Sequence, residues 1–202
     1  MIDTSGYTNM ASMFQEYKSL ITIPLLDTSN VKDMYYMFQG CTSLSTIPQL
    51  DTSNVTNMGY MFYACTSLTT IPQLVTNNVT TFQNMFLYCK KSKNVPELNA
   101  GKVNIISSCF SGCHELENFG GLKDLGKAYD TTKSANYSYY TLSLINSTKL
   151  THDSLMNVIN NLYDIASIRV QPQQLKLGNT NKAKLTEEEI AIATNKGWNV
   201  VA

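Results

Sequence analysis

A 24-residue period governs more than half of this chain. The clearest copy reads MFQGCTSLSTIPQLDTSNVTNMGY from Met37 to Tyr60, and related copies precede and follow it. A fixed period of this length is typical of solenoids, in which each unit buries its apolar side only against its neighbours. The period therefore predicts one elongated stack of units. The pairs that open the copies are Met13-Phe14, Met37-Phe38, Met61-Phe62, Met85-Phe86 and Cys109-Phe110.

Within one copy, the spacing of the apolar residues predicts local structure. Met34, Met37, Phe38 and Cys41 are spaced i, i+3, i+4 and i+7, which predicts a short helix over Met34–Thr42. The segment Ser43–Leu50 is rich in β-branched residues and predicts a short parallel strand. Proline cannot donate to a strand ladder, so we expect Pro24, Pro48, Pro72 and Pro96 to interrupt the pairing.

The polar corner of each copy predicts a turn rather than catalytic chemistry. Asp27–Asn30 and Asp51–Asn54 both read DTSN, whose side chains bond their own backbone in tight turns. We interpret the aspartates as turn residues and not as paired catalytic carboxylates. Stacking in register also predicts an amide ladder that satisfies buried backbone groups, formed by Asn30, Asn54 and Asn78.

The pattern LDTSNVTNMxxMFxxCxSLxxIP resembles the BspA-like leucine-rich repeats of bacterial surface proteins, over roughly residues 2–125. The resemblance implies an α/β solenoid, with short parallel strands on one side and short helices on the other. It also implies a cell-surface or secreted role in adhesion, by binding host or partner macromolecules. The pattern drifts at Ser92, Lys102 and Gly120, which indicates that the array is approaching its end.

Residues 126–202 lose the period and are predicted to form a longer-unit, helical C-terminal cap, while residues 1–125 form the repeat domain. Asp130–Tyr140 reads as an irregular connection. A helix is expected over His152–Ala166 with Thr151 as N-cap, and a second from Thr186 with a capping box to Glu189. Strand-like pieces are expected at Leu142–Leu144, Leu175–Leu177 and Trp198–Val200.

The beginning of the chain falls inside a repeat. Ile2 occupies the same slot as Leu26, so an apolar ladder and an open strand edge are expected to be uncovered there. We expect this end to continue into upstream repeats or to pack on a partner. The start of the sequence does not resemble a signal peptide, so the protein is intracellular, is exported by other means, or is a mature or excised segment, and we favour the last.

Charge and hydropathy exclude two classes of partner. The chain has 15 basic and 15 acidic residues, no basic patch for nucleic acid, and no apolar run long enough to span a membrane.

Of the five cysteines, Cys41, Cys65, Cys89 and Cys113 share one slot, which predicts buried free thiols. Cys109, Cys113 and His114 lack a convincing fourth metal ligand, and neither His114 nor His152 belongs to a catalytic motif. We therefore expect no metal, no cofactor and no enzymatic activity.

The surface is the remaining candidate for function. Tyrosine offers a large contact area at little cost in rotamer entropy, so a tyrosine row on one side favours binding of protein or glycan. The alternative, that the tyrosines shield the predicted helices and pair along the stack, stays open. Polar residues that alternate with the core on the predicted strands are further candidates. The candidate residues are Tyr35, Tyr36, Tyr60, Tyr63, Tyr88, Thr46, Thr70, Gln49 and Gln73.

The sequence thus predicts a non-enzymatic leucine-rich-repeat protein of the bacterial cell surface or secretome, which recognises a protein or glycan on a host or neighbouring cell. A structural or receptor-binding component of a phage tail is the alternative. A glycan-processing enzyme is disfavoured because the carboxylates are scattered or are assigned to turns and caps.

Overall fold

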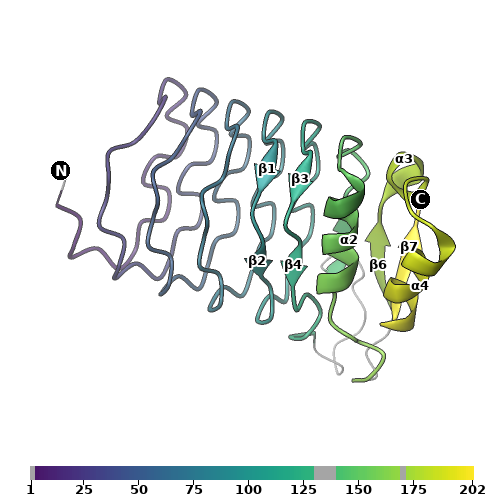
Figure 1. The fold of residues 1–202 in the computed structure, drawn as a ribbon. Coiled ribbons are helices and arrows are strands. Elements are labelled where there is room, and N and C mark those ends of the chain that lie inside the picture. The colour runs from purple at the N-terminus through teal and green to yellow at the C-terminus, as the bar shows by residue number, and fades with distance from the viewer. Residues whose placement is uncertain (1–2, 130–139, 169–171) are drawn as a thin grey trace.

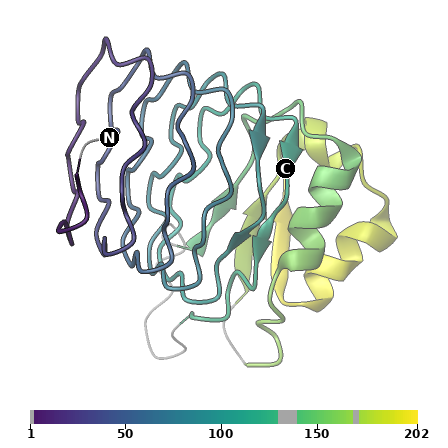
Figure 2. The same cartoon turned by 60° about the vertical axis from the view of Figure 1, so that its left-hand side comes forward.

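The repeats form coils that stack side by side from the N-terminus to a C-terminal cap (Figures 1 and 2). The computed structural model describes residues 3–129, 140–168 and 172–202, so Ile2 and most of the predicted connection at Asp130–Tyr140 lie outside the described residues. Parallel bridges join equivalent residues of neighbouring coils, from Asn9 to Asp33, Asp33 to Asn57, Asn57 to Thr81, and Thr81 to Ile105. One 24-residue repeat therefore makes one complete coil.

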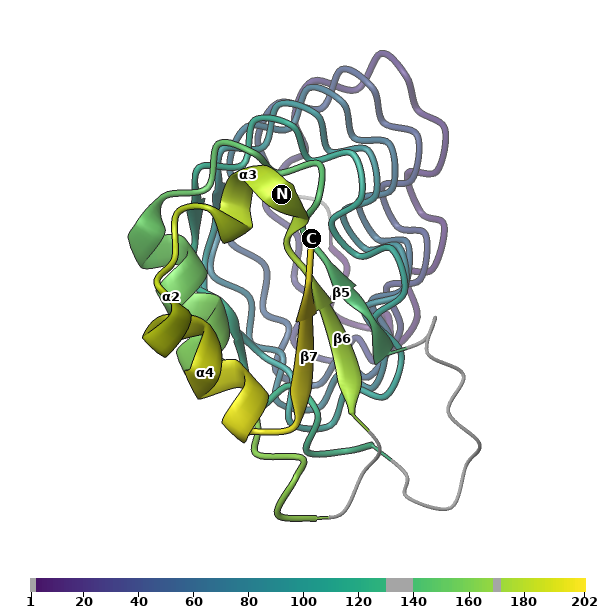
Figure 3. The ribbon, with the colours of Figure 1, turned by 90° about the vertical axis from the view of Figure 1, so that its right-hand side faces the viewer.

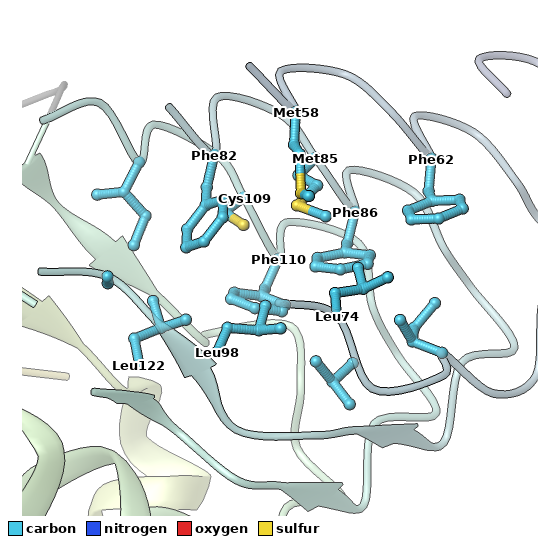
Figure 4. Packing of buried hydrophobic residues seen from close by; sticks show 14 of the residues in the cluster. Met58, Phe62, Leu74, Phe82, Met85, Phe86, Leu98, Cys109, Phe110 and Leu122 are labelled. Atoms are coloured by element: carbon cyan, nitrogen blue, oxygen red, sulfur yellow. The ribbon is translucent and has the colours of Figure 1, made fainter. Parts of the chain in front are cut away.

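The predicted apolar slots form the core between successive coils. The phenylalanines of the Met-Phe pairs stack nearly parallel, with ring centroids 5.6 Å apart between Phe38 and Phe62 and 5.7 Å apart between Phe62 and Phe86. Figure 4 shows this stack beside the leucine row that includes Leu74 and Leu98. Burial of a phenylalanine side chain contributes about 1.5–3 kcal/mol. Stacking the coils is thus what hides the apolar residues from water.

The cysteines are free and buried, as the sequence predicts. The thiols of Cys41, Cys65, Cys89 and Cys113 each donate to the carbonyl oxygen of a phenylalanine in the preceding coil, at 2.9–3.2 Å. Burial raises the pKa of Cys41 to about 11 and raises the pKa of Cys65 further. These thiols therefore belong to the core and not to a reactive site.

The helix predicted over Met34–Thr42 is wrong, because this segment is a run of turns. Tyr36 and Gly40 have φ values of 60° and 72°, which an α-helix cannot contain. Alternate amides bond three residues back, as from Met37 to the Met34 carbonyl. The amides between them cross to the next coil, as from Phe38 to the Met61 carbonyl at 2.9 Å. We call this side of the stack the turn side.

The crossing amides line up into three continuous columns, which we call the amide columns. In each column every N–H points toward the C-terminal cap and donates to a carbonyl one coil further on, at 2.7–3.1 Å. The donors are Ser12, Tyr36, Tyr60 and Asn84; Phe14, Phe38, Phe62 and Phe86; and Glu16, Gly40, Ala64 and Tyr88.

The opposite side, the strand side, is less regular than predicted. The strand expected over Ser43–Leu50 reduces to single hydrogen bonds, such as Ser45 N–H to the Ile21 carbonyl at 3.0 Å. Regular strands occur only in the last coils, where β1 (Asn94–Val95) pairs with β3 (Asn118–Phe119) and β2 (Leu98–Asn99) pairs with β4 (Leu122–Lys123). Pro96 separates β1 from β2, so the expected interruption of pairing by proline is confirmed there.

Exposed corners are joined by side-chain bonds to the preceding coil. The amides of Asn30, Asn54 and Asn78 donate to the carbonyl oxygens of Ser5, Ser29 and Ser53 at 2.7–3.0 Å. The expected ladder of asparagines therefore runs through backbone carbonyls at the surface, and not between amides over buried groups.

The cap contains a three-stranded parallel sheet with the order β5 (Leu142–Ser143), β6 (Gln173–Lys176), β7 (Trp198–Val201). Its helices are α2 (His152–Asn161), α3 (Gly178–Lys182) and α4 (Glu187–Asn195). The N-cap at Thr151 and the capping box at Thr186 are confirmed, but α2 ends before the predicted Ala166 because Leu162 is extended. No helix among the described residues is both long and apolar enough to cross a membrane.

In the cap, the sheet and the helices lie on the opposite sides of the stack from those that the sequence predicts for strands and helices in the repeats. Ser147 Oγ donates to the Cys113 carbonyl at 3.1 Å, so the segment that begins with β5 continues the turn side. Ser154 Oγ accepts from the Phe119 amide at 3.0 Å, so α2 continues the strand side. Figure 3 shows α2 and α4 on one side of the stack and β5–β7 on the other. The Met-Phe turns, and not the predicted strands, therefore correspond to the cap's sheet.

Candidate interaction surface

Five tyrosines from three consecutive coils form a continuous chain of ring contacts, which we call the tyrosine row. It comprises Tyr35, Tyr36, Tyr60, Tyr63 and Tyr88. Ring centroids lie 4.1 Å apart for Tyr35–Tyr36, 4.6 Å for Tyr36–Tyr60, 5.9 Å for Tyr60–Tyr63 and 6.0 Å for Tyr63–Tyr88. The rings are tilted by 49–67° to one another, which is a favourable arrangement for aromatic pairs. The structure thus brings all five predicted tyrosines together.

Small residues in the next coil make room for these rings. A β-carbon at Gly59 would lie 3.0 Å from Cε2 of Tyr35, and one at Gly112 would lie 2.6 Å from Cδ1 of Tyr88. Each of these tyrosines therefore leans over a glycine toward the cap. The position of the row depends on these glycines as well as on the rings themselves.

The row is partly buried by its own contacts, while Tyr88 remains 46% exposed. A hydrogen bond with Tyr36, together with partial burial, raises the pKa of Tyr35 to about 12. The Tyr35 phenol is therefore neutral at physiological pH. The rings pair along the stack, as one of the two alternatives predicts, and Tyr88 still offers an exposed edge.

The strand-side candidates lie apart from the tyrosine row. The amide of Gln49 donates to the Gln73 carbonyl at 2.6 Å, and that of Gln73 donates to the Glu97 carbonyl at 3.0 Å. These glutamines therefore link the coils. Thr46 and Thr70 are exposed, with no side-chain hydrogen bond to a described residue.

The first coil exposes large apolar side chains. Tyr7 and Tyr17 are 50% and 61% exposed, although their slot equivalents Val31 and Cys41 are fully buried. Tyr17 is therefore not the core side chain that its slot predicts. Ile21 and Leu25 are 64% and 53% exposed, and later coils place polar Ser45 and Gln49 in these slots. The sequence did not single out Ile21.

The titratable residues show no catalytic arrangement in the described part of the chain. His152 Nε2 lies 2.8 Å from Glu189 Oε1 and links α2 to α4. That hydrogen bond raises the pKa of His152. Within the described ranges, no group of three His, Cys, Asp or Glu residues is placed to hold a metal ion.

The sequence model of a family described as "Mycoplasma protein of unknown function, DUF285" matches residues 8–124, which is more than half of the chain. This chain belongs to the DUF285 family. The matched residues carry the coils and the entire tyrosine row, so the candidate surface of this DUF285 chain lies within the family's repeat region. Membership of the BspA-like group in particular stays a prediction.

A solved structure described as a leucine-rich repeat protein from T. pallidum resembles this DUF285 chain, with a TM-score of 0.50 and 20% sequence identity. The similarity covers 77% of each chain. It supports a fold of the leucine-rich-repeat type. A comparison with curated proteins found no significant match.

Proposed function

We propose that this protein is a non-enzymatic recognition module that binds a partner protein through the tyrosine row. The observation that carries the proposal is the unbroken chain of ring contacts from Tyr35 to Tyr88. Leucine-rich-repeat proteins are typically binding proteins, and the family and fold found for this chain fit that role. A pre-ordered aromatic surface loses little conformational entropy on binding.

A protein partner fits the row better than a glycan does. Sugars stack on exposed, flat ring faces, whereas these rings are tilted against one another and cover part of one another's faces. The row therefore presents ring edges and hydroxyls, which suit the apolar and hydrogen-bonding groups of a protein surface. We further propose that binding serves adhesion at the cell surface or after secretion, in accordance with the low charge and tyrosine-rich composition.

The repeat array itself supplies a test that preserves the fold. Tyr36 and Tyr60 share a slot with Ser12, and Tyr63 shares a slot with Gln39, so these residues are compatible with the backbone. The triple variant Y36S/Y60S/Y63Q should lose binding to an array of extracellular matrix proteins. The control T46N/T70N takes Asn94 as its template on the strand side and should bind as the wild type does.

Melting curves of both variants establish that the fold is retained. Equal binding by the wild type and the triple variant would exclude the tyrosine row as the contact surface. A glycan array is probed in parallel. If only the glycan array gave a signal that depended on these tyrosines, the ligand would be a carbohydrate and not a protein.

A further inference from the structure

We infer that a cavity between the last coil and the cap binds a tetrahedral oxyanion, of the phosphate or sulfate kind. The cavity has a volume of about 280 Å³ and is lined by residues of the turn side, β5 and β6. The lining residues are Ser108, Ser111, Thr141, Ser143, Ile145 and Lys176. This inference does not depend on the proposed function of the tyrosine row.

The first argument is the charge of the lining. Among the described residues that line the cavity, Lys176 is the one ionisable residue, and its ammonium group forms no ion pair or hydrogen bond with a described residue. No carboxylate of the described chain lines this space. A partly buried cation with no counter-charge favours an anionic ligand, because burial weakens the screening of its field by water.

The second argument is the direction of the backbone dipoles. One of the three amide columns ends at a residue that lines this cavity: the Asn84 amide donates to the Ser107 carbonyl, so Ser108 carries the next N–H of its column. That N–H forms no hydrogen bond with a described residue, whereas the last N–H of the third column, at Gly112, donates to Asn146 Oδ1 at 3.3 Å. Each peptide has a dipole of about 3.5 D, and aligned peptides place partial positive charge at their N–H end. The column of Ser108 thus directs positive potential into the cavity.

The third argument is the number of donors. The hydroxyls of Ser108, Ser111 and Ser143 make no hydrogen bond to another described residue, and they join the Ser108 amide and the Lys176 ammonium around one space. A carboxylate has two oxygens, whereas phosphate and sulfate have four oxygens that accept from donors in several directions. This donor set therefore matches a tetrahedral oxyanion.

The cavity also has a defined place on the surface. Ser108 occupies the repeat slot of Tyr60, and Ser111 that of Tyr63, so the cavity lies at the cap end of the tyrosine row. Replacing the rings with small hydroxyl residues in this coil opens the space that Lys176 borders.

Titration of the ¹⁵N-labelled chain with sodium phosphate, sodium sulfate and sodium acetate tests the inference, against sodium chloride at equal ionic strength. Phosphate, sulfate or both should shift the Ser108 amide resonance saturably. K176Q should weaken that binding at least tenfold, while K32Q, an exposed lysine in an early coil, should change it less than twofold. S108G removes the hydroxyl at a residue with a φ of 54°, which glycine adopts readily, and should weaken binding about threefold.

The phosphate and sulfate arms distinguish a phosphorylated source from a sulfated one. The inference would be overturned if phosphate and sulfate shifted the Ser108 amide resonance no more than chloride does. It would also be overturned if acetate bound as tightly as sulfate, or if K176Q bound the anion with unchanged affinity. Spectra of K176Q without added anion show whether the fold is retained. If that variant does not fold, about threefold weaker binding in S108G together with unchanged binding in K32Q supports the inference, and equal binding in S108G and the wild type overturns it. The absence of a saturable shift in the wild type also overturns it.

Discussion

The thiol of Cys65 donates to the carbonyl oxygen of Phe38, 3.1 Å away in the preceding coil. The same bond recurs between Cys89 and Phe62 and between Cys113 and Phe86. The Phe38 carbonyl also accepts from the Cys41 amide at 3.1 Å, so a buried thiol in this slot supplies a second hydrogen bond to that oxygen. The cysteine slot is therefore both an apolar and a hydrogen-bonding position.

This relationship predicts a graded thiol reactivity. At pH 8 the native protein should react slowly with an alkylating reagent, and Cys41 should react first because it is the least enclosed of the four and its pKa, about 11, is raised less than that of Cys65. Mass spectrometry of labelled peptides measures the order. All five thiols should label rapidly in denaturant, and rapid labelling of Cys65 in the native protein would contradict the prediction.

Gly59→Ala should displace the ring of Tyr35, because the added β-carbon would lie 3.0 Å from Cε2 of that ring. If the tyrosine row binds a partner, the affinity for that partner should fall several-fold while the melting temperature changes little. Gly6→Ala is the matched control, since its β-carbon would have no neighbour within 4 Å. Wild-type affinity in Gly59→Ala would show that the orientation of Tyr35 does not matter.

Ala64→Gly should stabilise the protein by up to about 1 kcal/mol, because Ala64 has a φ of 56° in the slot where other coils place Gly40 and Gly112. Ala191→Gly, in the middle of α4, should instead destabilise it by about 1 kcal/mol. Urea unfolding measures both free energies. The same replacement of alanine by glycine should thus raise the free energy of unfolding at residue 64 and lower it at residue 191.

The contact between α2 and α4 should depend on pH through His152 and Glu189. The raised pKa of His152 means that its contribution is complete below about pH 6.5 and is lost as the pH rises through the folded pKa. The lowered pKa of Glu189 means that its contribution is present above about pH 4.5 and is lost as the pH falls through the folded pKa. The pair should therefore stabilise the cap most between about pH 4.5 and 6.5. Hydrogen exchange of the α4 amides should accelerate less between pH 6 and 8 in H152Q, after correction for intrinsic rates, and H114Q should behave as the wild type.

I21S/L25Q should reduce association of the chain at its first coil. Both apolar side chains are more than half exposed there, and the replacements are the residues that the next coil uses in these slots. Sedimentation at increasing concentration should show self-association of the wild type that weakens in the double variant. Val75→Thr removes another exposed apolar side chain, 44% exposed, and should leave the association unchanged.

The repeat slots allowed most of the core to be predicted, because a residue that recurs every 24 positions must face its own equivalent. The spacing of Met34, Met37, Phe38 and Cys41 shows which side chains point inward, but turns and a helix both satisfy it. The signal that distinguishes them is Gly40, whose slot also holds Gly112, since a recurring glycine inside a supposed helix indicates a left-handed residue.

Two of the breaks in the pattern have structural reasons. Lys102 Nζ donates to Asn78 Oδ1 at 2.8 Å and thereby extends the corner contacts by one coil. A β-carbon at Gly120 would lie 2.2 Å from the Glu97 backbone nitrogen, so only glycine fits there. Ser92 is buried with its hydroxyl unpaired among the described residues, and nothing in the structure explains it.

The oxyanion cavity could not be predicted from the sequence. Ser108 and Lys176 are separated by most of the cap, and only the fold of β5 and β6 brings them to one space. The buried Asn181, whose amide donates to the carbonyls of Leu144, Ser147 and Leu177, was missed for the same reason.

The amide columns have a consequence for how arrays of this kind change length. Inserting or deleting 24 residues adds or removes one complete layer and leaves every remaining donor opposite an acceptor. A change of any other length would shift all later layers out of register. The length of the stack can therefore vary by whole coils, while the hydrogen bonds between coils and the contact with the cap stay the same.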